Sequence, residues 1–436
     1  MFEFVNILLL ALFAAAVVDT VLALRRAEAG AGRLRRAFAW LWRTEHPLFG
    51  GWCADFRQNA GPWLFAAGVA VYELNICFCN SMARENWPWV QGVMAPVLDA
   101  LLCLCFGLKI LFGTRYSWRS LGFAGCFFFI ARWVFLNCQN IWWIGLVLAV
   151  MAAKDVPLKL PLRAYLCSGG AAMALVVGLH LAGIVAPGLT SERVGEFRST
   201  YGYGHPNTFG GLLLGLILAY AMLRAKKMRW GDIALIFAGG VFLFVGPGSR
   251  SAALACILLA LALAVYRLRP RLFAGRAVPA LAASLVPLVA AASYILPLFL
   301  IKIGPWNNDF GPAWLAKLDA LLTNRLSLSW CAIRLIPVKI AGQVVLDWPP
   351  LDNSFIFSLY QLGPIVTLLW AGALAFVLYT LAKHGRTPEA LCLAVMLFYA
   401  FMEMQSFHFT TNPTVLLLCG ALYALPRERW PDRDTA

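Results

Sequence analysis

The amino-acid sequence predicts an all-α protein that crosses a membrane about 13 times. Of its 436 residues, 61% are hydrophobic and 13% are charged, whereas a soluble domain is about half apolar and about a quarter charged. One globular core cannot bury this excess of apolar side chains, which excludes a soluble enzyme and a disordered chain. A spanning helix needs about 20 mostly apolar residues, so the chain has room for 12–14 of them.

Thirteen apolar segments are the predicted spans. They cover residues 2–24, 61–80, 91–112, 120–138, 141–153, 164–188, 203–223, 231–246, 251–266, 277–301, 353–381, 389–406 and 412–425. The first has Arg25-Arg26 directly after it and no basic residue before it, which favours an uncleaved anchor over a signal peptide. Arginine alternates with apolar residues within 25–60, which predicts a helix at the membrane surface.

The net charge of +15 predicts the orientation. With the N-terminus outside, the inner loops carry 26 of the 36 Lys and Arg residues, and the outer loops carry nine. Cytoplasmic loops collect Lys and Arg, so the bias favours this topology and accounts for the charge without nucleic acid as a partner. Most of the 12 cysteines lie in apolar runs and none forms a CxxC pair, so we expect neither a disulfide framework nor a metal site.

One long loop distinguishes the outer side. Residues 1–301 hold ten predicted spans with short loops, residues 302–352 form the long outer loop, and residues 353–436 hold three spans and an inner tail. The loop has apolar residues at helical spacing, namely Trp314, Leu315, Leu318, Leu321 and Leu322. A second apolar stretch follows Asn324, so we expect two amphipathic helices on the outer membrane face. A long ordered loop of this kind is commonly functional.

Three outer segments carry candidate site residues. In the first, Arg193 and Arg198 precede Tyr201-Gly-Tyr-Gly-His-Pro-Asn207 at the start of a predicted span. His205 or Asn207 can cap that helix, but a cap leaves the two arginines and Tyr201 unexplained. A helix N-terminus beside guanidinium groups binds anions, so this segment is a candidate anion site.

The second segment is the tight turn Gly246-Pro-Gly-Ser249-Arg250-Ser251. An arginine in a loop this short stays at the bilayer surface, where it either snorkels to lipid headgroups or binds an anion. The small residues beside Arg250 allow a ligand to approach closely, which favours the anion.

The third segment belongs to the long loop and holds Arg325, Arg334 and Asp352-Asn353. Arg334 can equally face solvent, and Asp352-Asn353 can cap the next helix. A carboxylate beside arginines can also act as a general base toward a hydroxyl group. The candidates for that base are Asp352, His205 and Glu403, which lies near the outer end of the twelfth predicted span.

The ordered set of these pieces resembles the O-antigen ligase/polymerase superfamily of bacterial membrane glycosyltransferases, most closely the Wzy-type polymerases of capsule and exopolysaccharide clusters. The matching pieces are Arg198 to Asn207, Ser249-Arg250, Asn324-Arg325, and Asp352-Asn353-Ser354 with Gly363. The resemblance implies a GT-C-like fold and an undecaprenyl-diphosphate-linked oligosaccharide as substrate. It also implies that Arg198, Arg250 and Arg325 hold the diphosphate. The ligase branch typically has histidine where Asp352 stands, which favours a polymerase.

The sequence therefore predicts a polymerase of lipid-linked repeat units, active on the outer face of the bacterial cytoplasmic membrane without a metal or another cofactor. The predicted catalytic residues are Arg198, Arg250, His205 and Asp352. The predicted substrate-binding residues are Arg193, Tyr201, Asn207, Ser249, Arg325, Arg334, Asn353 and Glu403. A flippase and a chain-length regulator are candidate partners. The alternatives are a ligase that transfers finished glycan and a polysaccharide or lipid transporter, which the intramembrane residues Glu73, Asp99 and Arg132 keep open.

Overall fold

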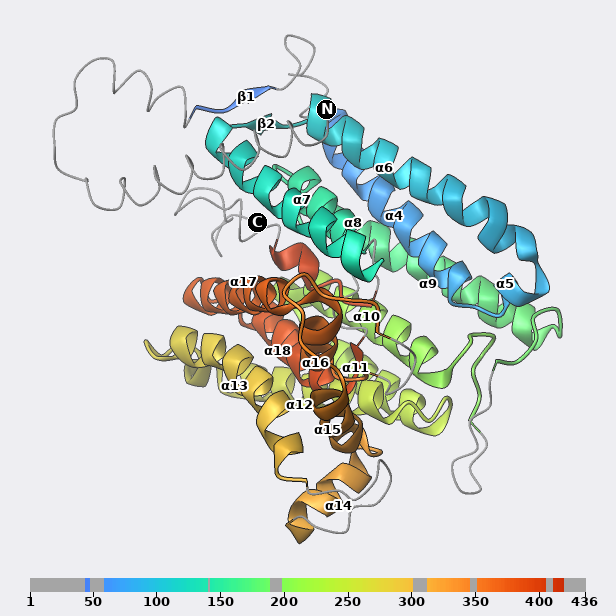
Figure 1. The fold of residues 1–436 in the computed structure, drawn as a ribbon, viewed down its shortest axis with the longest axis vertical. Coiled ribbons are helices and arrows are strands. Elements are labelled where there is room, and N and C mark those ends of the chain that lie inside the picture. The colour runs from blue at the N-terminus through green and yellow to red at the C-terminus, as the bar shows by residue number, and fades with distance from the viewer. Residues whose placement is uncertain are drawn as a thin grey trace, which may run out of the picture.

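The computed structural model shows a helical, multi-pass membrane protein (Figure 1). It describes residues 44–47, 59–139, 142–188, 198–300, 312–345, 351–404 and 411–418. The first predicted span, most of the predicted surface helix, Arg193, and the last predicted span beyond residue 418 lie outside the described residues.

Within the described residues, eight helical segments are long and apolar enough to cross a membrane. They are α4 (Gly61–Cys79), η2 (Val90–Met94) continued by α6 (Ala95–Phe112), α7 (Trp118–Cys138), α9 (Lys159–Leu181), α10 (Pro206–Arg224), α12 (Arg250–Leu268), α13 (Val278–Leu298) and α17 (Pro364–Lys383). Shorter apolar helices are α8 (Trp142–Ala152), α11 (Trp230–Val245) and α18 (Thr387–Met402). All of these helices fall on predicted spans, whereas the total of 13 and the GT-C-like fold stay predictions.

Proline marks the start of many of these helices. It occupies the first or second position of α4, α6, α10, α13, α17 and α18. Its missing N–H costs no hydrogen bond there, because the first N–H groups of a helix have no partner within it. In these six helices, proline therefore marks a start that the sequence already shows.

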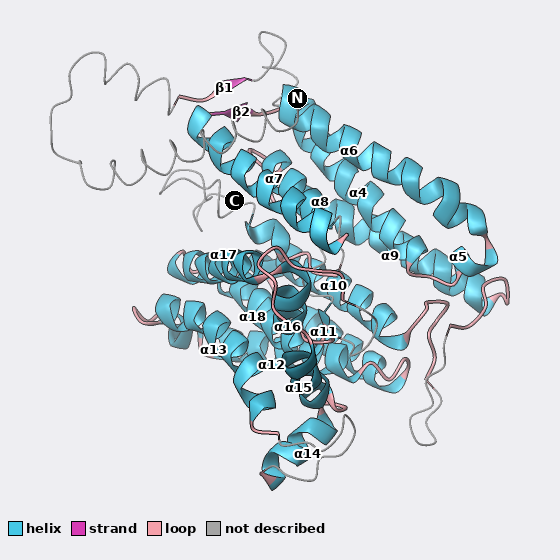
Figure 2. Ribbon diagram, viewed as in Figure 1, coloured by secondary structure: helices cyan, strands magenta, loops and turns pink. Residues whose placement is uncertain are grey.

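The helices form two groups (Figure 1). In the first group α4 packs between α6 and α9, and α8 contacts α6 and α7. In the second group α11 pairs with α12, α13 pairs with α17, and α18 contacts α12 and α13. α10 packs against α9 and α12, so it joins the groups, and one hydrophobic core runs through both. Two short strands, β1 (His46–Pro47) and β2 (Arg115–Tyr116), form a small antiparallel pair (Figure 2).

The loops separate to two ends of the bundle. At the first, the Lys154 end, Lys154 Nζ donates to the Arg115 carbonyl (2.7 Å) and pairs with Glu45 Oε1 (3.0 Å). At the second, the site end, the N–H of Met82 donates to the carbonyl of Gly202 (2.8 Å). The first three residues come from loops predicted to lie inside and the last two from loops predicted to lie outside. The structure thus separates the two predicted sets of loops.

The predicted span 353–381 is wrong at its start. The short helices α16 (Ser354–Phe357) and η5 (Ser358–Leu362) precede Gly363, and the spanning helix α17 begins only after it. Gly363 has φ +86°, and a Cβ there would lie 2.2 Å from the carbonyl oxygen of Ile340. Only glycine fits this break, which keeps α16 and η5 at the site end.

The long loop contains the two expected helices, α14 (Ala313–Leu321) and α15 (Arg325–Leu335). Asp319 of α14 is fully buried, and its Oδ1 accepts from the N–H groups of Leu326 (2.9 Å) and Ser327 (3.1 Å). This carboxylate therefore caps α15 from the preceding helix. α15 packs against α13 with most of its residues from Leu326 to Ala332 buried, so it belongs to the bundle rather than lying flat on a membrane.

Candidate functional site

A cluster of polar side chains at the site end centres on Glu403. Glu403 follows the end of α18 in extended backbone and is 5% exposed. Its Oε1 accepts hydrogen bonds from Asn207 Nδ2 (3.0 Å), Ser251 Oγ (2.7 Å) and Arg325 Nη2 (2.5 Å). One carboxylate oxygen thus ties together α10, α12, α15 and the end of α18. Burial raises the pKa of Glu403, and the Arg325 guanidinium opposes that rise.

Arg198 extends the cluster on the other side of Asn207. Its buried Nη2 donates to Asn207 Oδ1 (3.0 Å) and to the Gly248 carbonyl (3.0 Å). Gly248 has φ +64°, and a Cβ there would lie 3.1 Å from Arg198 Nε, so glycine lets the turn close over the guanidinium. Arg250 stands two residues after Gly248, is exposed, and begins α12. The structure therefore brings the predicted arginines 198 and 250 to one turn.

Arg325 links Glu403 to Asp352. Its Nε lies 3.5 Å from Asp352 Oδ2, and the side chain of Asp352 is 36% exposed against 10% for Arg325. Burial lowers the pKa of Arg325, but the charges of Glu403 and Asp352 outweigh this and raise the pKa overall. Arg325 therefore stays cationic, and Asp352 is the more accessible of its two carboxylate partners.

His205 caps α10, which changes its predicted role. The N–H of Asn207 donates to His205 Nδ1 (3.1 Å), so in the neutral ring the proton sits on Nε2. A nitrogen that carries a proton donates a hydrogen bond and cannot take up another proton. In this tautomer Nε2 is a hydrogen-bond donor and not a general base, so Asp352 and Glu403 stay as the candidates for the base.

The hydrogen-bonding groups of the Asn353 side chain are all engaged within the protein. Asn353 is 2% exposed, its Nδ2 donates to Ser293 Oγ and the Phe401 carbonyl (2.9 Å each), and its Oδ1 accepts from two backbone N–H groups of α16. An amide has no further donor to offer a ligand. The prediction that Asn353 binds substrate is corrected to a cap that positions Asp352 beside Arg325.

Three further predicted residues lie apart from the cluster's polar contacts. Ser249 is fully buried against Gly210, where a Cβ would lie 2.1 Å from the serine Oγ. Tyr201 stacks its ring on Phe209 at 5.0 Å between centroids. Arg334 is exposed, sits over the Trp330 ring at 5.9 Å, and comes nine residues, or about 13 Å of helix, after Arg325. These positions fit packing for Ser249 and Tyr201 and a surface cation–π contact for Arg334.

Two serines of the cluster were absent from the predicted site. Ser251 Oγ donates to Glu403 Oε1, and Ser354 Oγ donates to the Glu403 carbonyl (2.6 Å). Both directly follow predicted residues, Arg250 and Asn353, but serine is common in turns and helix caps. What marks these two serines as part of the cluster is their hydrogen bonds to Glu403. Glu403 is far away in the sequence, so spacing along the chain does not show these contacts.

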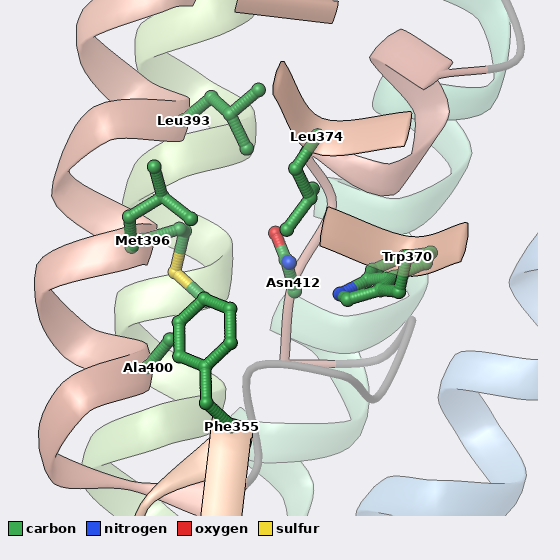
Figure 3. Close-up of a pocket in the computed structure, with 8 residues that line it drawn as sticks. Phe355, Trp370, Leu374, Leu393, Met396, Ala400 and Asn412 are labelled. Carbon is green, nitrogen blue, oxygen red and sulfur yellow. The ribbon is translucent and has the colours of Figure 1, made fainter. Parts of the chain in front are cut away.

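An apolar pocket lies beside the cluster, between α16, α17, α18 and residues 411–418 (Figure 3). It is lined by Phe355, Trp370, Leu374, Leu393, Met396, Leu397, Ala400 and Asn412. Asn412 and the indole N–H of Trp370 are the polar groups of this lining, and no lining residue carries a charge that could bind an anion or move a proton. The charged cluster is therefore the candidate site.

The charges of the cluster favour an anionic ligand. Arg325 pairs with the carboxylates of Glu403 and Asp352. Arg198 adds a buried guanidinium that contacts Asn207 and the Gly248 carbonyl, and Arg250 stands exposed on the same turn. In the described part of the chain, no group of three or more His, Cys, Asp or Glu side chains is placed to hold a metal ion. Compared with known proteins, the chain matches no family model, no curated protein and no solved structure.

Proposed function

We propose that this protein is a membrane glycosyltransferase that polymerises undecaprenyl-diphosphate-linked oligosaccharide repeat units on the outer face of the cytoplasmic membrane. The observation that carries the proposal is the placement of three arginines at one end of a bundle of apolar helices: Arg198 contacts the turn that carries Arg250, and Arg325 joins Asn207 through Glu403. A ligand for these arginines must reach the membrane surface and carry negative charge. A lipid-linked diphosphate has both properties.

The three arginines would have different roles toward the diphosphate. Arg250 is exposed at the start of α12, and guanidinium binds phosphate oxygens in a two-pronged way. Arg198 and Arg325 are held by internal hydrogen bonds, so they supply fixed positive charge close to the ligand. Fixed charge that meets developing negative charge stabilises a transition state by several kcal/mol.

The transfer step is an attack by a hydroxyl group of the incoming repeat unit on the anomeric carbon of the donor chain. A new carbon–oxygen bond forms, the bond between that carbon and the diphosphate breaks, and its electron pair leaves with the diphosphate. The hydroxyl proton passes to a base. Asp352 suits this task because its side chain is the more exposed of the two carboxylates and Arg325 holds it in place.

The orientation follows from the positive-inside bias. The site end carries the loops predicted to be outside, and the Lys154 end carries loops rich in Lys and Arg. Nucleotides are scarce outside the cell, so a substrate that already carries its leaving group fits this side. The diphosphate provides that group.

The test is polymerisation by purified protein in lipid vesicles that contain the lipid-linked repeat unit, taken from cells that lack this protein. We expect a ladder of products from the wild type and none from Arg250→Ala. Arg84→Ala is the matched control, because Arg84 is also an exposed arginine at the site end and pairs with Glu85; it should give the normal ladder. A normal ladder from Arg250→Ala, or no ladder from the wild type, would refute the proposal.

A further inference from the structure

Glu73 is a buried carboxyl group that the proposed reaction does not use. It lies in α4 and is 1% exposed. Its side chain points across to α9, where a Cβ on Gly169 would lie 3.4 Å from Glu73 Oε2. Among the described residues, none forms a hydrogen bond with Glu73 Oε1 and none forms an ion pair with Glu73. Glycine at 169 leaves the room that this carboxyl occupies.

Among the described residues, the titratable groups around Glu73 on α4, α9 and the loop before α10 are uncharged at neutral pH. They are Tyr72 and Cys77 on α4 itself, Tyr165 on α9, and Tyr203 from the loop before α10. The acid on α6 is Asp99, which accepts a hydrogen bond from Asn75 (2.7 Å) rather than contacting Glu73. An ionised carboxylate here would therefore have no opposite charge in the described part of the bundle. A lone charge in a membrane interior is costly, and a carboxyl group avoids the cost by holding its proton.

We propose that Glu73 is a proton-binding site between α4 and α9 that holds its proton at neutral pH. Loss of this proton moves the side chain of Tyr203, and this movement reaches the site end. The hydroxyl of Tyr203 is buried and has no hydrogen-bond partner among the described residues. Tyr72 and Tyr165 also carry hydroxyls near Glu73, but the hydroxyl of Tyr203 is the one that is buried without a described partner, so it can turn to donate to an ionised Glu73.

Tyr203 gives the proton site a direct path to the cluster. It stands two residues before His205, which caps α10 and orders Asn207. Burial, the Cys77 thiol and the Glu73 carboxyl all raise the pKa of Tyr203, so its hydroxyl stays a donor. A Tyr203 drawn toward an ionised Glu73 would pull on the segment that carries His205. The proton site itself stands independently of which reaction the cluster performs.

Infrared spectra of the purified protein at a series of pH values test the proton site. A protonated carboxylic acid has a carbonyl stretching band distinct from that of a carboxylate. We expect a band of this kind in the wild type at neutral pH that is absent from Glu73→Gln and unchanged in the control Glu85→Gln, since Glu85 is well exposed. Glutamine has the shape of the protonated acid, so this variant should fold.

The link to Tyr203 has its own readout. In Tyr203→Phe the carboxylate loses its donor, so the midpoint at which the Glu73 band disappears should move up by about 1 to 2 pH units. Equal spectra for wild type and Glu73→Gln would overturn the proton site, and an unchanged midpoint in Tyr203→Phe would overturn the link. Loss of the band on adding Na⁺ at fixed pH would overturn the proton as ligand in favour of a metal cation.

Discussion

Asn207 donates from Nδ2 to Glu403 Oε1 over 3.0 Å, which joins residues 196 positions apart in the chain. The other end of the same amide accepts from Arg198. The Asn207 amide therefore lies between a buried cation, Arg198, and a buried anion, Glu403. Its oxygen accepts from the cation and its nitrogen donates to the anion. The cluster depends on this neutral residue as much as on its charged ones.

Asn207→Asp should destabilise the protein strongly. Aspartate would place a second carboxylate against Glu403 in a buried site and remove the donor, at a cost of about 3 kcal/mol. We expect a clearly lower midpoint of thermal unfolding in detergent. Asn137→Asp is the control, because Asn137 is exposed near the end of α7 and donates only to a carbonyl of its own helix. Equal midpoints for the two variants would contradict the role given to Asn207.

Arg325 and Glu403 should behave as one unit. Arg325→Met or Glu403→Gln alone leaves a buried charge without its main partner, which costs about 3–5 kcal/mol. The double variant removes both charges, so its loss of unfolding free energy should fall well short of the sum. A double-variant cycle by chemical denaturation measures the difference. Additive losses would show that the 2.5 Å contact contributes nothing.

Asp352→Asn tests the general base. Asparagine keeps the shape of Asp352 but cannot take up the hydroxyl proton, so polymerisation should slow by about 10²- to 10⁴-fold. Binding of the lipid-linked repeat unit, measured by fluorescence titration, should change little. Glu85→Gln serves as the matched loss of an exposed carboxylate at the same end. Polymerisation at the normal rate in Asp352→Asn would leave Glu403 as the base.

Arg334→Ala should leave the product ladder intact. Its guanidinium lies over Trp330 on an exposed part of α15, well away from Arg325 along the helix. The loss of a surface cation–π contact costs about 0.5–1 kcal/mol, so only a slight fall in thermal stability is expected. Product length and yield in the vesicle assay check this. A shortened ladder would place Arg334 back among the substrate-binding residues.

The sequence by itself determined the membrane class, the positions of the helices in the described chain and the arginine segments that meet at one end. Apolar runs must be buried in lipid, and a proline or glycine fixes a helix end through its own backbone, so these features are local. Arg198 and Arg250 could be paired in advance because each stands beside a helix start on the same predicted side.

Only the tertiary structure decided what those side chains do. From the sequence, Asn353 and Ser249 are both predicted site residues. In the structure, internal hydrogen bonds occupy the Asn353 amide, and Ser249 packs against Gly210. Ser251 became visible once the fold brought Glu403 to it. Hydrogen bonds join whichever groups the packed helices place within about 3 Å, and that placement depends on contacts between distant segments.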